Sequence, residues 1–205
     1  RVGHPRHRWR PLLLDSMRAL AVGDFMTSDR RVTEVKRLAA LTDDPALMLS
    51  LNAHFVTSSR LMHRDDMMRM ALPELANGVG ATRHGRYIEA ALRAGIGATL
   101  EDRALVEAAL AIATESPIGF VIDSLNAAIP EGAAFAGSSA LRRELLERWR
   151  AMTTEHVIGG VIPFTYEGPV ARILALLDRS PAGLREALAD AEARGYRPWV
   201  AQIHY

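Results

Sequence analysis

Four ionisable side chains of this chain stand on or beside predicted helices, where a helical bundle could bring them together. They are Glu74, His84, Glu115 and His156. No single helix can surround an ion, so the ligands of helical carboxylate sites project inward from several helices. Carboxylate and imidazole ligands with open coordination positions suit Fe(II) or Mn(II). The four residues are therefore candidate metal ligands.

Each of these residues also has a purely structural interpretation. Glu74 could be a solvated carboxylate at a helix end, and His84 could cap the N-terminus of the next helix. Glu115 lies in the apolar stretch AIATESPIGFVI, where burial is unfavourable unless another group pairs with the carboxylate. It could instead face solvent at a kink before Pro117. His156 could be a buried histidine whose hydrogen bonds are satisfied.

The stretch Glu144–Gly160 predicts the second half of a long amphipathic helix. Within it, Trp149, Thr153 and His156 follow the spacing i, i+4, i+7, which places three side chains on one helical face. Whatever Trp149 contacts, the other two should contact as well. We expect Trp149 and Thr153, together with Tyr87, to line a substrate pocket.

Composition narrows the class of protein. At 205 residues the chain fits a single domain over residues 1–205, with 49% apolar and 24% charged residues, as in ordinary globular proteins. The formal net charge of +1 gives no reason to expect a nucleic-acid or membrane partner. Without cysteine there is neither a disulfide nor a thiolate metal site. No apolar run is long enough to span a membrane, so we expect a cytoplasmic protein.

The chain reads as a series of helices joined by short loops, which predicts an all-α bundle. Asp44 before Pro45 and Ser180 before Pro181 mark helix starts, because each pair combines an N-cap with a first-turn proline. Three other stretches read differently. Residues 1–11 predict a basic, solvated arm, residues 130–137 a loop, and the tail from Arg197 either a last strand or a docked extension.

The stretch from Leu51 to Gly97 resembles the heme-oxygenase-like diiron oxidases, whose helical fold also occurs in thiaminase II and pyrroloquinoline-quinone synthase proteins. In that family a glutamate ends one helix, a glycine-containing turn follows, and a histidine opens the next helix. Glu74 and His84 match this pattern, and the phrase ALRAGIG closes the helix after it. A second glutamate of the family corresponds to Glu115.

The last family motif, His-x3-Asp-x2-His, falls on Trp149, Thr153 and His156, so only its final histidine is kept. Thr153 supplies no carboxylate, and the Trp149 indole has no lone pair for a metal. A diiron site needs roughly six protein ligands, and we therefore expect one metal ion rather than two. Trp149 could equally fill the cavity and close the site.

Three functions follow from the resemblance and its departures. The first is an oxidase or oxygenase that oxidises a small molecule with O2 at Fe(II) or Mn(II). The metal would be held by Glu74, His84, Glu115 and His156, with Glu115 and His156 as the central, catalytic ligands. The second is a metal-free pocket in which His84, Glu115 and His156 act as acid–base groups or as substrate contacts. The third is a non-catalytic partner protein of a biosynthetic assembly, with the methionines of Met48–Met70 as an adaptable surface. The resemblance also leaves a homodimer open, since related bundles often pair and the apolar tail could dock on a neighbouring copy.

Overall fold

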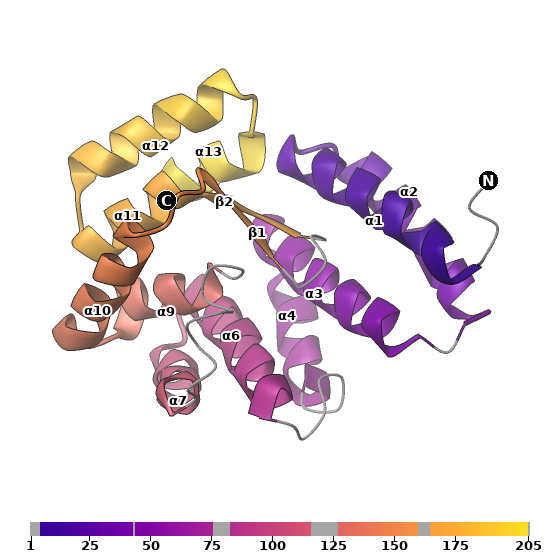
Figure 1. The fold of residues 1–205 in the computed structure, drawn as a ribbon, viewed down its shortest axis with the longest axis horizontal. Helices are drawn as coiled ribbons and strands as arrows, with labels where there is room; N and C mark the ends of the chain where they lie inside the picture. The colour runs from indigo at the N-terminus through magenta and orange to yellow at the C-terminus, as the bar shows by residue number, and fades with distance from the viewer. Residues whose placement is uncertain (1–4, 43, 76–82, 116–126, 160–164, 205) are drawn as a thin grey trace.

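The chain is helical over most of its described length, which confirms the predicted fold class (Figure 1). The computed structural model describes residues 5–42, 44–75, 83–115, 127–159 and 165–204. In this part of the chain the strands form one two-stranded antiparallel sheet, made of β1 (His156–Gly159) and β2 (Thr165–Pro169). No described helix is both long enough and apolar enough to cross a bilayer.

The helices follow one another closely along the chain. In order they are α1 (Pro5–Ala21), α2 (Phe25–Ala39), α3 (Pro45–Leu61), α4 (Asp65–Ala71), the short 3-10 helix η1 (Leu72–Glu74), α6 (Arg83–Thr99), α7 (Arg103–Thr114), α9 (Ala128–Ala136), α10 (Ser139–Arg150), α11 (Val170–Asp178), α12 (Pro181–Ala193) and α13 (Arg197–His204).

The predicted helix starts at Asp44 and Ser180 are confirmed. The Asp44 carboxylate accepts a hydrogen bond from the Ala46 N–H at 3.1 Å, and Pro45 occupies the first turn of α3. The Ser180 hydroxyl accepts from the Gly183 N–H at 3.1 Å at the start of α12. In both places a short polar side chain satisfies a backbone donor that has no partner within the helix.

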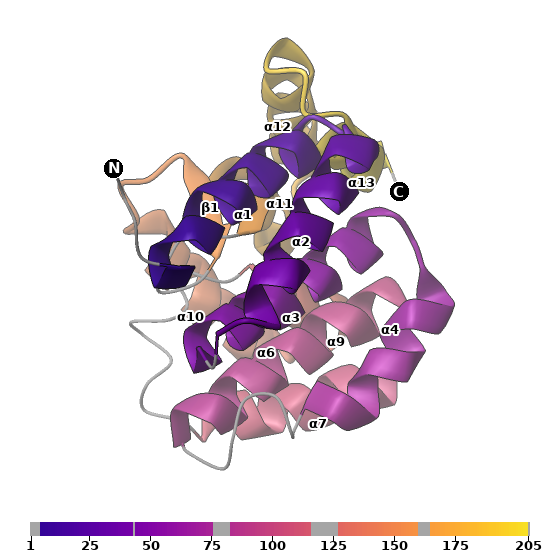
Figure 2. The same ribbon diagram turned by 90° about the vertical axis from the view of Figure 1, so that its right-hand side faces the viewer.

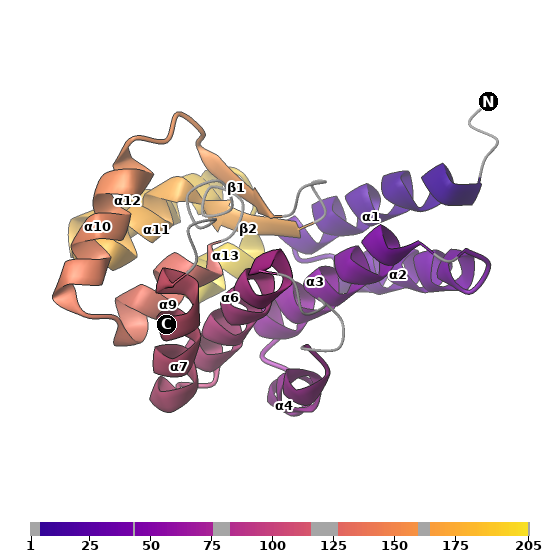
Figure 3. The same ribbon diagram turned by 60° about the horizontal axis from the view of Figure 1, so that its bottom comes forward.

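Neighbouring helices pair, and the strands lie between the pairs. α1 contacts α2, α6 contacts α7, and α11 contacts α12. Figure 2 shows α1 and α2 side by side on one face of the molecule. The β1–β2 hairpin lies between these N-terminal helices and the C-terminal helices α11–α13, as Figures 1 and 3 show. Strand β2 contacts α1, α3 and α11, so it joins parts of the chain that are distant in sequence.

The hairpin contains a β-bulge that determines where one acidic side chain lies. Val157 pairs with Gly168, and Ile158 pairs with Tyr166, so Glu167 is the extra residue on β2. A bulge of this kind bends the strand and redirects the extra side chain. All five residues of β2 are buried, and Glu167 is therefore held inside the protein.

The predicted helix over Glu144–Gly160 is wrong in its second half. Helix α10 ends at Arg150, Thr153 lies exposed in the following connection, and His156 opens strand β1. The stripe Trp149–Thr153–His156 therefore does not exist as one helical face. The physical reason is the β-branched pair Val157 and Ile158, which is stabilised by pairing with β2 rather than by helical packing.

The basic arm predicted for residues 1–11 is also wrong from Pro5 onward, while residues 1–4 lie outside the described part of the chain. Helix α1 begins at Pro5, and the Trp9 side chain is fully buried against Val35 and Leu47. Its indole N–H donates to the Asp44 carboxylate at 3.3 Å. Burial of one large aromatic side chain contributes enough free energy to order this segment despite its charges.

The structure decides two further predictions in the C-terminal half. The loop predicted for residues 130–137 is mostly helix α9, which ends at Ala136. The tail from Arg197 forms helix α13, and its Trp199 packs within the same chain against Leu20 and Tyr166. Of the two alternatives for the tail, the docked extension is therefore the one observed.

Candidate functional site

The predicted metal ligands occupy different surroundings. Glu74 is exposed at the end of η1, and Glu115 is exposed just after α7. The Glu115 carboxylate thus faces solvent, as one of the two interpretations expected. The backbone of His84 belongs to α6, but its side chain lies outside the described residues.

His156 is partly buried and contacts tyrosines. Its Nδ1 lies 3.0 Å from the hydroxyl of Tyr166, and its Nε2 lies 4.0 Å from the Glu155 carboxylate. Burial is the main reason why the pKa of His156 is lowered, and the charge of Arg194 lowers it further. The imidazole is therefore neutral at neutral pH and has a described hydrogen-bond partner on the neighbouring strand.

Within the described residues, no group of three or more histidine, aspartate or glutamate side chains is placed to hold a metal ion. Because the His84 side chain is not among them, the four-ligand site stays a prediction. Tyr87 and Trp149 do lie together, but in the largest apolar core, where each is 1% exposed. Trp149 fills this core, and Thr153 is exposed on the surface.

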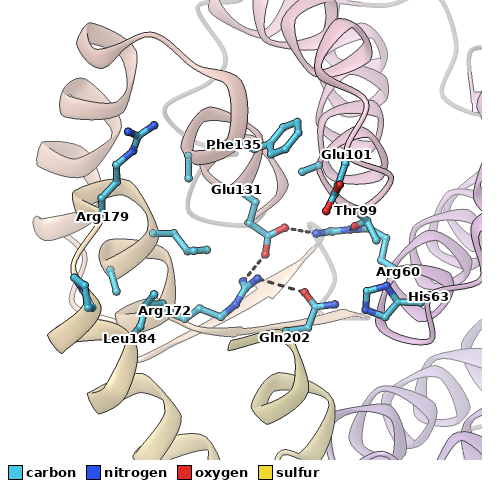
Figure 4. Close-up of a pocket in the computed structure, with 15 residues that line it drawn as sticks. Arg60, His63, Thr99, Glu101, Glu131, Phe135, Arg172, Arg179, Leu184 and Gln202 are labelled. Atoms are coloured by element: carbon cyan, nitrogen blue, oxygen red, sulfur yellow. Dashed lines mark hydrogen bonds and ion pairs between the residues drawn. The ribbon is translucent and has the colours of Figure 1, made fainter. Parts of the chain in front are cut away.

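A different part of the molecule contains a cavity of ≈ 520 Å³ (Figure 4). It lies among α3, α6, α9, α11, α12 and α13. Its polar lining residues are Arg60, His63, Thr99, Glu101, Glu131, Arg172, Arg179 and Gln202. The apolar part of the lining includes Phe135, Leu176 and Leu184, together with three alanines and a proline.

Two buried charges form the centre of the polar lining. Glu131 on α9 and Arg172 on α11 are each 6% exposed, and Arg172 Nη1 donates to Glu131 Oε1 at 2.5 Å. The second carboxylate oxygen, Oε2, accepts from Arg60 Nη2 on α3. Burial raises the pKa of Glu131, but Arg60 and Arg172 together outweigh it, so the pKa is lowered overall. Glu131 is therefore ionised at neutral pH.

Neutral groups hold the two arginines in place. Arg60 Nε donates to the hydroxyl of Thr99 at 3.2 Å. The Arg172 guanidinium lies over the indole of Trp199, 5.5 Å from the ring centroid, and its Nη2 faces Gln202 Oε1 at 3.5 Å. Figure 4 shows the Glu131 carboxylate between the two guanidinium groups, with Gln202 beyond Arg172. The network thus joins five helices, α3, α6, α9, α11 and α13, at one wall of the cavity.

The backbone at the cavity is unusual at three points. Among the described residues, the non-glycine residues with a left-handed φ are His63 at 48°, Glu101 at 56° and Arg179 at 53°. All three line the cavity. Each follows the end of a helix, where the backbone closes the helix with a hydrogen bond such as Ser180 N–H to Ala175 O at 2.9 Å. Glycine is the usual residue at such a position, because it adopts this φ without steric cost.

A second buried carboxylate lies behind this wall. Glu167 accepts from the Ala127 N–H at 2.7 Å and from the Thr165 hydroxyl at 3.2 Å. Burial raises the pKa of Glu167 to about 7, although Arg60 lowers it in part. Glu167 and Arg60 line a separate enclosed void of ≈ 10 Å³, which is about the space of one water molecule.

Sequence reasoning missed Glu131 and Arg172, although a signal was present. Each is a single charged residue within an apolar helical run, AAIPEGAAFA for Glu131 and VARILALL for Arg172. The same argument directed attention to Glu115, whose carboxylate proved to be exposed. The sequence alone does not tell which lone charge is buried, because that depends on the helix packed against it.

Comparisons of the chain with protein-family models, with curated proteins and with solved structures found no match. The resemblance to the heme-oxygenase-like diiron oxidases therefore stays a prediction, and the case for a function depends on the cavity.

Proposed function

We propose that this protein binds a small molecule in the cavity lined by Arg60, Glu131 and Arg172. The observation that carries the proposal is the combination of a buried charged network and an apolar wall in one cavity of ≈ 520 Å³. Ligand pockets in proteins typically have volumes of about 300–1,000 Å³, with mostly apolar lining and a few fixed polar groups. The three left-handed positions give independent support.

A charged network of this kind adds little to the free energy of unfolding by itself. Removing two arginines and a carboxylate from water is unfavourable, and well-packed apolar side chains of similar volume are often as stable. A non-glycine residue in the left-handed region adds a further cost of about 1 kcal/mol or more. His63, Glu101 and Arg179 adopt this conformation beside the cavity, and each supplies a side chain that glycine would lack. Both features are accounted for if the side chains contact a ligand.

Of the functions predicted from the sequence, the metal-free small-molecule pocket agrees best with this site. The residues differ from those expected, since Trp149 and Tyr87 lie in the apolar core and not at the cavity. Oxidation at Fe(II) or Mn(II) depends on His84 and stays a separate prediction.

A cavity-filling substitution tests the proposal. Ala134 lines the cavity on α9, and Ala134→Phe places a phenyl ring in it, whereas Ala140→Phe adds the same ring at an exposed position of α10. Thermal unfolding is measured with a set of aromatic and aliphatic fragments. A ligand at tenfold its dissociation constant stabilises the wild type by about 1.4 kcal/mol. We expect fragments to raise the Tm of the wild type and of Ala140→Phe, but not that of Ala134→Phe.

Equal shifts in all three proteins would overturn the proposal, because binding would then take place elsewhere. A second filling variant, Leu184→Trp on α12, keeps the test decisive if Ala134→Phe does not fold. Absence of any shift across the fragment set would also contradict the proposal.

A further inference from the structure

We propose that the group recognised in this cavity is a single carboxylate on an apolar molecule, bound by Arg172 and Gln202. This inference rests on the proposed function, since it assigns a chemical class to the ligand of the same cavity. Its basis is the balance of charges in the lining, the geometry around Arg172 and the position of the apolar wall.

The charges in the described lining leave one positive charge in excess. Three arginines, Arg60, Arg172 and Arg179, accompany two glutamates, Glu101 and Glu131. A buried charge is stable only when it is paired and hydrogen-bonded. Glu131 is shared between Arg60, whose side chain is 13% exposed, and the buried Arg172, so one carboxylate serves two guanidinium groups. Arg60 also interacts electrostatically with Glu167. Among the described residues, Arg172 is paired with Glu131 alone, so one further negative charge beside Arg172 would complete its pairing.

Arg172 has the geometry to receive that charge. Its Nη1 is bound to Glu131 at 2.5 Å, whereas its Nη2 faces Gln202 Oε1 at 3.5 Å, well beyond the usual length of about 2.9 Å for such a bond. A ligand carboxylate oxygen can accept from Nη2 at a shorter distance. If the Gln202 amide turns, its NH2 group donates to the same carboxylate, because this side chain carries both a donor and an acceptor.

The same network disfavours other headgroups. Glu131 stays ionised beside Arg172 because its pKa is lowered, and Glu101 stands at another part of the lining. A dianionic phosphate would bring a second negative charge close to Glu131. An ammonium group would meet the guanidinium of Arg172. A singly charged carboxylate is the headgroup that the local charges accommodate best.

The remaining lining accommodates an apolar body. Phe135 on α9, Leu176 on α11 and Leu184 on α12 belong to the lining, along with alanine side chains that leave space. Apolar surface that leaves water on binding contributes favourable free energy in proportion to its area. The headgroup thus supplies orientation, and the body supplies most of the affinity.

A series of isosteric ligands tests the inference. Hydrocinnamate, its amide, the corresponding alcohol and the phosphate monoester of that alcohol share one phenylalkyl body and differ in the headgroup. Their dissociation constants are measured by calorimetric titration at neutral pH. We expect the carboxylate to bind at least about tenfold more tightly than the amide or alcohol, which cannot form charge-assisted bonds to Arg172. It should also bind more tightly than the phosphate, whose second negative charge is repelled by the ionised Glu131.

Two variants locate the binding. Gln202→Leu removes the amide on α13 without touching the ion pairs of Glu131, and should weaken hydrocinnamate binding about threefold to tenfold while leaving the alcohol unchanged. Arg185→Gln, at an exposed position of α12, is the matched control and should change neither constant.

The outcomes separate the inference from the proposed function. Equal affinity for the carboxylate, amide and alcohol, or tighter binding of the phosphate, would overturn the carboxylate inference and leave the cavity as a binding site. Binding of other fragments but of no member of the series would do the same. If no compound of any kind shows binding that Ala134→Phe abolishes, both proposals fail.

Discussion

Two buried polar regions join distant helices in this molecule, and they differ in charge and in surroundings. The first is the cavity network of Arg60, Glu131 and Arg172. The second joins α1, α2 and α3 through Ser16, Ser28 and His54, whose side chains are at most 2% exposed. The cavity network is ionic and borders open space, whereas the serine–histidine cluster is built from hydroxyl and imidazole groups that do not line that cavity.

The serine–histidine cluster is compact. The Ser16 hydroxyl lies 2.8 Å from the Ser28 hydroxyl and 2.9 Å from Nε2 of His54, and the Ser28 hydroxyl lies 3.3 Å from the same nitrogen. Hydroxyl groups can donate or accept, so the cluster adapts when one member is changed. It serves to fix three helices relative to one another.

The difference teaches that burial alone does not mark a functional site. Both regions are buried and hydrogen-bonded, but only the ionic one adjoins the cavity. Its donor Arg172 Nη2 makes a long hydrogen bond of 3.5 Å to Gln202. A net hydrogen bond contributes about 0.5–1.5 kcal/mol, whereas breaking a buried ion pair costs about 3–5 kcal/mol. The two regions should therefore respond very differently to substitution.

The largest effect is expected for Arg172→Met. This change leaves the ionised Glu131 buried with only Arg60, and we expect the free energy of unfolding to fall by about 3–5 kcal/mol in urea titrations. Arg185→Met, at an exposed position, should change it by less than about 0.5 kcal/mol. Combining Arg172→Met with Glu131→Gln should cost less than the sum of the single changes. Additive losses would contradict the pairing.

The next effect is a pH dependence from Glu167 beside the network. Its pKa of about 7 lies above the ordinary value of 4.5, so the native protein favours the protonated form. Its contribution to stability is fully present below pH 4.5 and is lost as the pH rises to about 7, a loss of about 3 kcal/mol. The lowered pKa of Glu131 has the opposite effect, because its contribution to stability is lost as the pH falls below the ordinary value of 4.5.

Glu167→Gln tests this assignment through urea titrations between about pH 5 and pH 8. We expect the variant to lose the decrease in stability that the wild type shows over this range, since the amide does not ionise. Glu147→Gln, at an exposed position of α10, should keep the wild-type curve. Parallel curves for the wild type and Glu167→Gln would show that Glu167 does not titrate there.

A smaller effect is expected in the serine–histidine cluster. Ser16→Ala removes one hydroxyl but leaves Ser28 and His54 within 3.3 Å of each other, so no buried polar group loses every partner. We expect a loss of about 1 kcal/mol in the free energy of unfolding. Ser139→Ala, at an exposed position of α10, serves as the control. A loss as large as that of Arg172→Met would erase the difference between the two regions.

The smallest effect on stability is expected for His156→Ala, which removes a partly buried hydrogen bond to Tyr166 and should cost about 0.5–1 kcal/mol. The same variant tests the predicted iron site. If Glu74, His84, Glu115 and His156 hold Fe(II), anaerobic loading gives stoichiometric iron in the wild type and none in the variant. Equal iron content in both proteins would contradict that site.

Much of the local structure could be predicted from the sequence, but little of the candidate site could. The caps at Asp44 and Ser180 are local signals, and each was confirmed. The continuation of α10 to Gly160 was wrong, because pairing with β2 outweighed the helical pattern. The site itself depends on Glu131 meeting an arginine 71 residues earlier and another 41 residues later.

The sequence by itself determined the helical class and the helix starts, since propensity, capping and apolar periodicity act over a few residues. Only the tertiary structure decided which lone charges are buried together, which end of a helical pattern becomes a strand, and where a cavity remains. These outcomes depend on the packing of segments far apart in the chain, where desolvation and ion pairing differ by several kcal/mol between alternative arrangements.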